Sequence, residues 1–132
     1  MSGDMKTVLI ADDDEDILAL VDRALSESGY EVLLARDGAT ALAMVREQKP
    51  ALTLLDVSMP ELDGYEVTSA VKSDPATKDT IVILFTARSE ASDVEKGYEA
   101  GADDYIMKPF TLKTLQSRVA AALGRGTDVA QG

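Results

Sequence analysis

Five short apolar runs alternate with five stretches of helical periodicity along this chain, and no other feature constrains its fold as strongly. The apolar runs lie at residues 8–11, 32–35, 52–55, 81–85 and 105–107. The helical spacing follows each run, at residues 17–28, 39–45, 67–71, 91–98 and 112–122. Continuous apolar runs are typical of strands covered on both faces, and spacings of three and four residues are typical of helices that pack one face on a core.

This alternation predicts a parallel sheet built from strand–helix–strand units of about 24 residues each. Five strands are too few for an eight-stranded barrel. We therefore expect an α/β fold with a doubly wound five-stranded parallel sheet in the order 2-1-3-4-5, a flavodoxin-like three-layer α/β/α arrangement. One domain is expected over residues 6–123, with residues 124–132 forming a flexible tail or the start of a linker.

The charge and the missing residue types exclude several functions. Asp and Glu number 24 against 13 Lys and Arg, a net charge of −11, which disfavours direct binding of nucleic acid. Cys and His are absent, so disulfides, thiolate or imidazole catalysis and Cys or His metal sites are excluded. No apolar run approaches the roughly 18 residues of a membrane span and no signal peptide opens the chain. A cytoplasmic protein without a membrane segment is expected.

Polar residues lie at the ends of four of the five predicted strands, at one edge of the predicted sheet. They are Asp12, Asp13, Asp14, Glu15 and Asp16 at the end of the first strand, Asp56 at the end of the third, Thr86 at the end of the fourth and Lys108 at the end of the fifth. Because strands 1 and 3 are expected to be neighbours, the carboxylates of Asp12, Asp13 and Asp56 should converge. Carboxylates this close repel one another unless a cation joins them, and Mg²⁺ favours oxygen ligands. Lys108 would supply a second positive charge.

Each of these residues also has a purely structural interpretation. Acids 14–16 are typical of a helix N-terminus, where they cap the backbone and favour the helix dipole. Asp56 alone could be a turn residue, Thr86 a buried strand residue and Lys108 a solvated loop residue. Only their predicted meeting at one edge of the sheet favours a shared binding site.

The same residues carry a resemblance to a known family. The chain resembles the receiver domain of two-component response regulators, in particular a single receiver like the chemotaxis regulators. The matching motifs are IADDD at residues 10–14, DVSMPELDG at 56–64, TA at 86–87, GADDY at 101–105 and KPF at 108–110. The resemblance covers residues 6–123, and the order and spacing of the motifs make it specific.

The resemblance implies a role for each site residue. Asp56 would be the phosphorylation site, and Mg²⁺, or Mn²⁺ in its place, would be held by Asp13, Asp56 and the Ser58 backbone carbonyl, with Asp12 acting through water. Thr86, Lys108 and Tyr105 would bind the phosphoryl group or respond to it. The Lys108–Pro109 peptide would be cis.

Two further residues are expected to set how long the phosphoryl group survives. Ser58 and Arg88 follow Asp56 and Thr86 by two residues. Serine is short and leaves room for the attacking water. Arginine is long and permanently charged, so we expect Arg88 to shield the phosphoryl group.

The function implied is a phosphorylatable switch that catalyses only its own phosphotransfer and dephosphorylation. A sensor histidine kinase or phosphotransfer protein would donate the phosphoryl group. The face formed by the fourth helix, fifth strand and fifth helix would then change and control an effector protein or a fused output domain. The apolar stripe of the first helix is wide, and it could be only a broad face packed on the core. The resemblance favours instead that Ile17 or Leu20 lies exposed and contacts the kinase.

Other functions fit the sequence less well. A hydrolase of the aspartyl-phosphate type would carry its nucleophile after the first strand in an Asp-x-Asp motif, whereas Asp56 follows the third. A flavin or nucleotide carrier would need a Gly-rich loop after the first strand, where this chain has five acids. A metal-independent interaction module would not need the complete set of acids, threonine and lysine.

Overall fold

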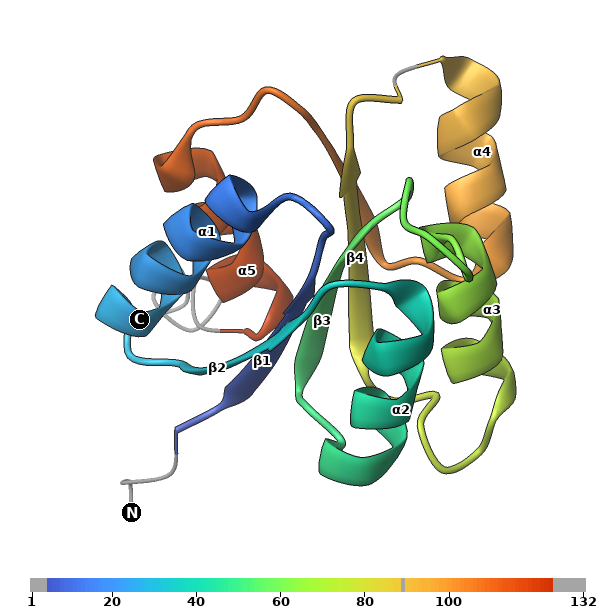
Figure 1. The fold of residues 1–132 in the computed structure, drawn as a ribbon, viewed down its shortest axis with the longest axis horizontal. Coiled ribbons are helices and arrows are strands. Elements are labelled where there is room, and N and C mark those ends of the chain that lie inside the picture. Colours follow the sequence, from blue (N-terminus) through green and yellow to red (C-terminus); the bar gives the residue numbers. More distant parts are fainter. Residues whose placement is uncertain (1–4, 89, 125–132) are drawn as a thin grey trace.

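The computed structural model describes residues 5–88 and 90–124. Strands and helices alternate along them, as the apolar pattern predicts (Figure 1). They are β1 (Thr7–Ala11), α1 (Glu15–Glu27), β2 (Glu31–Ala35), α2 (Gly38–Gln48), β3 (Leu52–Asp56), α3 (Gly64–Ser73), β4 (Ile81–Thr86), α4 (Ala91–Ala100), β5 (Asp104–Met107) and α5 (Leu112–Ala122).

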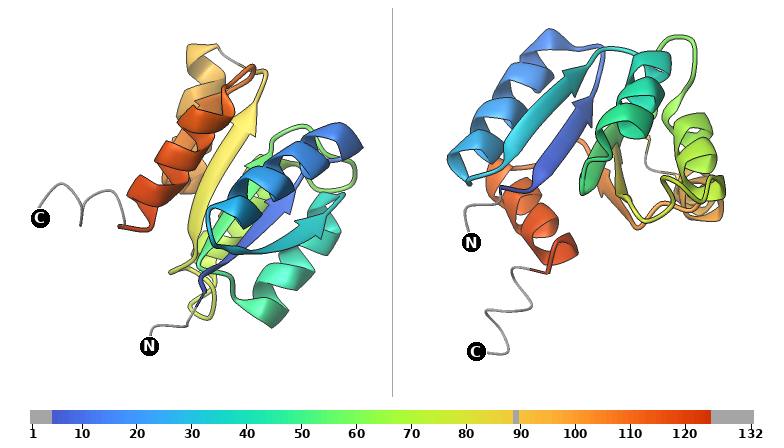
Figure 2. Two further views of the ribbon diagram at one scale, coloured as in Figure 1. Left: turned by 90° about the vertical axis from the view of Figure 1, so that its left-hand side faces the viewer. Right: turned by 90° about the horizontal axis from the view of Figure 1, so that it is seen from below.

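The strands form one parallel sheet in the order β2-β1-β3-β4-β5, which confirms the predicted topology. Helices α1 and α5 cover one face of the sheet, and α2, α3 and α4 cover the other (Figures 1 and 2). The order of the strands reverses between β1 and β3, the position where sheets of this kind bind ligands at their carboxyl edge.

Two apolar cores explain why the strands read as continuous apolar runs. Leu9 and Leu55 point into the core shared with α2, α3 and α4, whereas their neighbours Ile10 and Leu54 point into the core shared with α1 and α5. All five residues of β3 are buried. Because successive side chains of a strand alternate between the two faces, a strand buried on both faces needs an apolar residue at nearly every position.

Capping side chains fix the starts of α1 and α3. The Asp14 carboxylate accepts hydrogen bonds from the backbone N–H groups of Asp16 and Ile17, at 2.9 and 3.4 Å, so Asp14 takes the capping role expected of it. Helix α3 begins with a capping box, in which Asp63 and Glu66 each accept a hydrogen bond from the other's backbone N–H.

The ends of two strands agree with the expectation. Asp56 and Thr86 are the last residues of β3 and β4. The predicted tail at residues 124–132 lies, apart from Gly124, outside the described residues. Within the described part of the chain, no helix combines the length and the apolar character needed to cross a bilayer.

Candidate functional site

Three carboxylates meet at the carboxyl edge of the sheet, between β1 and β3. Ala11 and Leu55 are paired across the two strands, so the residues that follow them, Asp12 and Asp56, lie side by side. Asp12 is 0% exposed and Asp56 6%, whereas Asp13 is exposed to solvent. One carboxylate oxygen from each of the three lies within 4.8 Å of the others. The structure therefore brings together the acids that the strand order predicts.

The backbone around these acids holds them in place. Oδ1 of Asp12 accepts a hydrogen bond from the Asp14 backbone N–H at 2.9 Å, and Oδ1 of Asp56 accepts one from the Ser58 backbone N–H at 3.3 Å. The start of α3 packs directly behind Asp56: a methyl group added at Gly64 would lie 2.7 Å from the Asp56 carbonyl oxygen. Gly64 is therefore required for α3 to approach the site this closely.

Lys108 closes the site from the side of β5. Its Nζ donates a hydrogen bond to Oδ2 of Asp12 at 2.9 Å and lies 3.7 Å from Oδ2 of Asp56. The ammonium group also lies 5.0 Å from the centre of the Phe85 ring. The Lys108–Pro109 peptide bond is cis. Lys108 is thus nearer to Asp12 than to Asp56 in this structure.

Burial and charge change the acidity of Asp56. Burial is the main cause that raises its pKa to about 6, and the neighbouring Asp12 carboxylate raises it further. Lys108 and the Ser58 N–H oppose this shift. The carboxylate is therefore mostly ionised at neutral pH but more basic than an ordinary aspartate.

The donor set of the site fits a hard divalent cation. It consists of the oxygens of Asp12, Asp13 and Asp56, and Mg²⁺ prefers carboxylate oxygens and water as ligands. Lys108 offsets one of the three negative charges, and the Asp12 carboxylate still adds to the effect of burial in raising the pKa of Asp56. A bound divalent cation would remove that imbalance.

The loops that follow β3 and β4 are joined at the rim of the site. Nε of Arg88 donates a hydrogen bond to Oγ of Ser58 at 3.2 Å, and both side chains are exposed. Thr86 is buried, and its hydroxyl oxygen accepts a hydrogen bond from the Arg88 backbone N–H at 3.3 Å. Arg88 therefore lies across the rim rather than pointing away from it.

Two buried tyrosines lie behind this loop, and sequence reasoning singles out only one of them. The Tyr105 hydroxyl donates to the Arg88 carbonyl at 2.9 Å and lies 3.5 Å from the hydroxyl of Tyr65. Burial raises the pKa of Tyr105, and the hydrogen bond with Tyr65 adds to this shift. Tyr65 was missed because its partners lie 28 and 40 residues away, so local spacing carries no signal of them.

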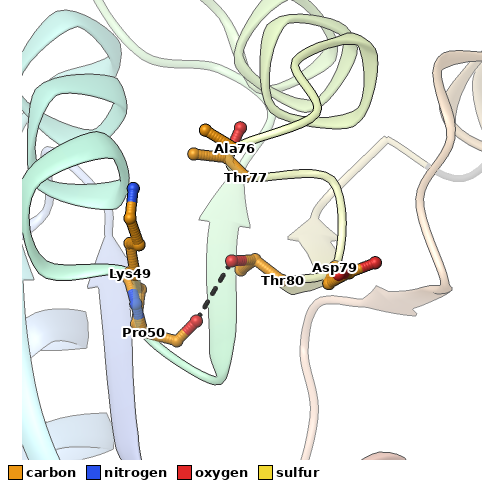
Figure 3. Close-up of a pocket in the computed structure, with 6 residues that line it drawn as sticks. All are labelled: Lys49, Pro50, Ala76, Thr77, Asp79 and Thr80. Carbon is orange, nitrogen blue, oxygen red and sulfur yellow. Dashed lines mark hydrogen bonds between the residues drawn. The ribbon is translucent and has the colours of Figure 1, made fainter.

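A second hollow lies at the opposite edge of the sheet, where β3 and β4 begin (Figure 3). Its volume is about 220 Å³, below the several hundred Å³ usual for ligand pockets. Its buried hydroxyl groups are already used within the protein: Thr80 donates to the Pro50 carbonyl at 3.1 Å and Thr77 to the Val71 carbonyl at 2.8 Å. The acidic site is therefore the better functional candidate.

Comparison with known proteins identifies this arrangement. The family model for the response regulator receiver domain matches residues 8–120. The transcriptional regulatory protein PrrA of Mycobacterium tuberculosis is 47% identical over 118 residues, which cover 89% of this chain and 50% of PrrA. This chain therefore spans about half the length of PrrA and of the other curated relatives compared here.

Solved structures agree with the family model. The chemotaxis response regulator CheY4 of Vibrio cholerae superposes with a TM-score of 0.85 at 31% identity, covering 89% of this chain and 98% of that one. The receiver domain of DrrB, solved in a form activated by beryllofluoride, superposes with a TM-score of 0.84 at 36% identity, covering 92% of this chain and 100% of that one.

Proposed function

The chain belongs to the family of response regulator receiver domains of two-component systems, and from that premise we propose that it is a phosphorylation switch. Asp56 accepts the phosphoryl group from a sensor histidine kinase, a phosphotransfer protein or a small phosphodonor. The observation that carries the proposal is the meeting of Asp12, Asp13, Asp56 and Lys108 at the carboxyl edge between β1 and β3. The receiver domain is placed at residues 6–123, in a cytoplasmic protein.

The chemical step is nucleophilic substitution at phosphorus. A carboxylate oxygen of Asp56 forms a bond to the phosphorus atom, while the bond from phosphorus to the donor breaks and the donor keeps its electron pair. A pKa of about 6 leaves Asp56 ionised at neutral pH and more nucleophilic than an ordinary carboxylate. Water later cleaves the acyl phosphate and restores the carboxylate.

The remaining residues neutralise and position charge. Asp13, Asp56 and the Ser58 carbonyl would hold Mg²⁺, or Mn²⁺ in its place, with Asp12 acting through water, and the cation would offset the negative charge of the phosphoryl oxygens. Lys108 Nζ lies 3.7 Å from Asp56 Oδ2, within reach of a phosphoryl oxygen after a small shift away from Asp12.

The output of the switch is proposed on the face formed by α4, β5 and α5. The Thr86 hydroxyl would turn to the phosphoryl group and Tyr105 would follow it, because the Arg88 backbone contacts both. Tyr98 and Met107 are large apolar residues on this face, 47% and 45% exposed. The partner is a downstream effector or a fused output domain, as the length of the transcriptional regulators among the relatives suggests.

Incubation with acetyl phosphate and Mg²⁺ tests the proposal. Intact mass should rise by one phosphoryl group, and peptide mapping should locate it on Asp56. Asp56→Asn should abolish the increase, and Asp13→Asn should abolish Mg²⁺ binding and with it the phosphorylation that requires Mg²⁺. Asp16→Asn is the matched control, because Asp16 is an exposed acid on α1 outside the carboxylate cluster. Labelling that persists in Asp56→Asn would contradict the assignment.

A further inference from the structure

Helix α4 has the fewest buried residues of the five helices, although Val94 packs partly buried against the core. Gly97 is its one buried residue. The N-cap residue Glu90 makes no side-chain hydrogen bond to the first turn. The helix therefore depends on contacts made to it by other elements.

Tyr65 of α3 makes such a contact with the first turn of α4. Its side chain is buried in the core, and its hydroxyl group donates a hydrogen bond to the Asp93 carbonyl at 3.0 Å. The ammonium group of Lys96, one turn further along α4, lies 4.9 Å from the centre of the Tyr65 ring. One side chain from α3 thus contacts two successive turns of α4 by two different interactions.

Tyr105 makes the parallel contact from β5. A methyl group added at Gly97 would lie 3.0 Å from Cδ2 of Tyr105, so α4 rests directly on the Tyr105 ring. The Tyr105 hydroxyl holds the Arg88 carbonyl, just before α4 begins, and lies 3.5 Å from the Tyr65 hydroxyl. The two hydroxyl groups form one polar cluster beneath the start of α4.

Tyr65 is also close in the chain to the phosphorylation site. It follows Gly64, whose backbone N–H donates to the Val57 carbonyl at 2.9 Å. A methyl group added at Gly64 would lie 2.7 Å from the Asp56 carbonyl oxygen, so the two backbones are closely packed. A displacement of the backbone at Asp56 would therefore reach Tyr65 through two tightly packed residues, independently of Thr86.

We propose that Tyr65 is a positioning residue of the switch, whose hydroxyl group acts with that of Tyr105 to hold the first turn of α4. This inference rests on the proposed function for its signalling consequence, because α4 belongs to the proposed output face. Asp56 would then be connected to α4 in two ways. One runs through Thr86 and Tyr105, and the second runs through the start of α3 and Tyr65.

Hydrogen–deuterium exchange of the whole chain without any phosphodonor tests the contact itself. Tyr65→Phe keeps the ring and removes the hydroxyl, and the α4 amides should then exchange about fivefold faster, the loss expected for one hydrogen bond. Tyr105→Phe should act similarly, and the double variant should exchange more slowly than the product of the two effects predicts. Tyr30→Phe, in the core on the other face of the sheet, is the control and should leave the exchange of α4 unchanged.

Three outcomes of these exchange experiments would contradict the proposed role of Tyr65. If Tyr65→Phe accelerates exchange equally in all elements, or leaves α4 unchanged, the proposed contact is overturned. If the two single effects multiply in the double variant, the hydroxyl groups do not act together and that part of the proposal fails.

Beryllofluoride with Mg²⁺ tests the signalling part. The exchange of α4 should change when it is added to the unmodified chain, and the change should be at least halved in Tyr65→Phe. A full response in Tyr65→Phe would overturn the role of Tyr65 in the switch. Absence of any response in the unmodified chain would instead refute the proposed function, while the experiment without phosphodonor would still decide whether Tyr65 holds α4.

Discussion

Thr53 carries a hydroxyl group in the middle of β3, between Leu9 and Val82 of the neighbouring strands. Thr53 is fully buried. Among the described residues, its Oγ1 is the one buried side-chain oxygen or nitrogen atom that has no hydrogen-bond partner. Burying a polar group without a partner costs free energy, whereas an apolar group of the same shape does not.

Thr53→Val should therefore raise the free energy of unfolding by about 1 kcal/mol, because valine has the same shape and no hydroxyl to desolvate. Urea denaturation should show a higher midpoint with an unchanged slope. Thr68→Val is the matched control and should lower the midpoint, because the buried Thr68 hydroxyl donates to the Gly64 carbonyl at 2.7 Å. A lower midpoint in Thr53→Val would show that the hydroxyl is satisfied in solution.

The Arg88 guanidinium is positioned to shield a phosphoryl group on Asp56. It is held by Ser58 Oγ, at the rim of the site. Arg88→Ala should shorten the half-life of the phosphorylated protein in Mg²⁺ buffer by about fivefold, the effect of about 1 kcal/mol for an exposed charged contact. Ser58→Met should lengthen it, because the bulkier side chain obstructs the attacking water.

Arg23→Ala serves as the control for Arg88→Ala, since Arg23 is an exposed arginine on α1 that pairs with Glu27. The half-life of the phosphorylated Arg23→Ala variant should equal that of the phosphorylated unmodified chain. An unchanged or longer half-life in Arg88→Ala would show that the guanidinium does not shield the phosphoryl group.

At the residue scale, the sequence predicts which side chains gather but not which atoms pair. Asp12, Asp13 and Asp56 follow from the strand order alone. The preference of Lys108 for Asp12 depends on distances of 2.9 and 3.7 Å, which are set by the path of the chain after β5 and leave no pattern in the sequence. The hydrogen bond between Arg88 and Ser58 likewise leaves no pattern in the sequence, because it depends on the paths of two loops.

At the element scale, the apolar runs cover the centres of the strands but not their last residues. Backbone hydrogen bonding continues through Asp56 and Thr86, and it does not require an apolar side chain. The α3 helix begins at Gly64, earlier than the apolar spacing from residue 67 indicates, because the capping box of Asp63 and Glu66 fixes its start. That signal was present in the sequence as an acid followed three residues later by glutamate.

On helix α1, the two residues proposed to contact the kinase differ in their exposure to solvent. Ile17 is partly buried against the core shared with α5, whereas Leu20 is 48% exposed. Leu20 lines a groove between α1 and α5, beside Leu112 and Gln116. Of the two, Leu20 is therefore the residue available to a partner.

Leu20→Ala should slow phosphotransfer from the cognate histidine kinase by about tenfold, because an apolar side chain buried in an interface contributes over 1 kcal/mol. Phosphorylation by acetyl phosphate should not change, since Leu20 lies outside the carboxylate cluster. Met5→Ala is the control, because Met5 is likewise an exposed apolar side chain. An equal loss with both donors would place the defect in the chemistry and contradict a docking role.

At the scale of the whole molecule, the acidic site opposes folding. The chain carries a net charge of −11, and folding brings three carboxylates together with one lysine. The cost appears in Asp56, whose pKa rises to about 6 chiefly because it is buried. Function thus retains a charge arrangement that the fold alone would not favour.

The sign of the resulting pH dependence follows from proton binding. Below about pH 4, Asp56 is protonated in both the folded and the unfolded chain and contributes nothing. Between about pH 4 and the folded pKa of about 6, the folded state binds more protons than the unfolded state, so rising pH lowers the free energy of unfolding. Above about pH 6 the full penalty applies, at most about 3 kcal/mol.

Asp56→Asn should therefore stabilise the protein at pH 7.5 in EDTA, and the gain should vanish as the pH falls to about 4. Urea denaturation of both proteins across this range measures the difference. Mg²⁺ should narrow the gap at pH 7.5, because a cation that binds the folded chain stabilises the site with three carboxylates more than the site with two. If Asp56→Asn is no more stable than the unmodified chain at pH 7.5, then Lys108 and the Ser58 N–H already offset the buried charge, and the folded pKa of Asp56 must lie near its ordinary value.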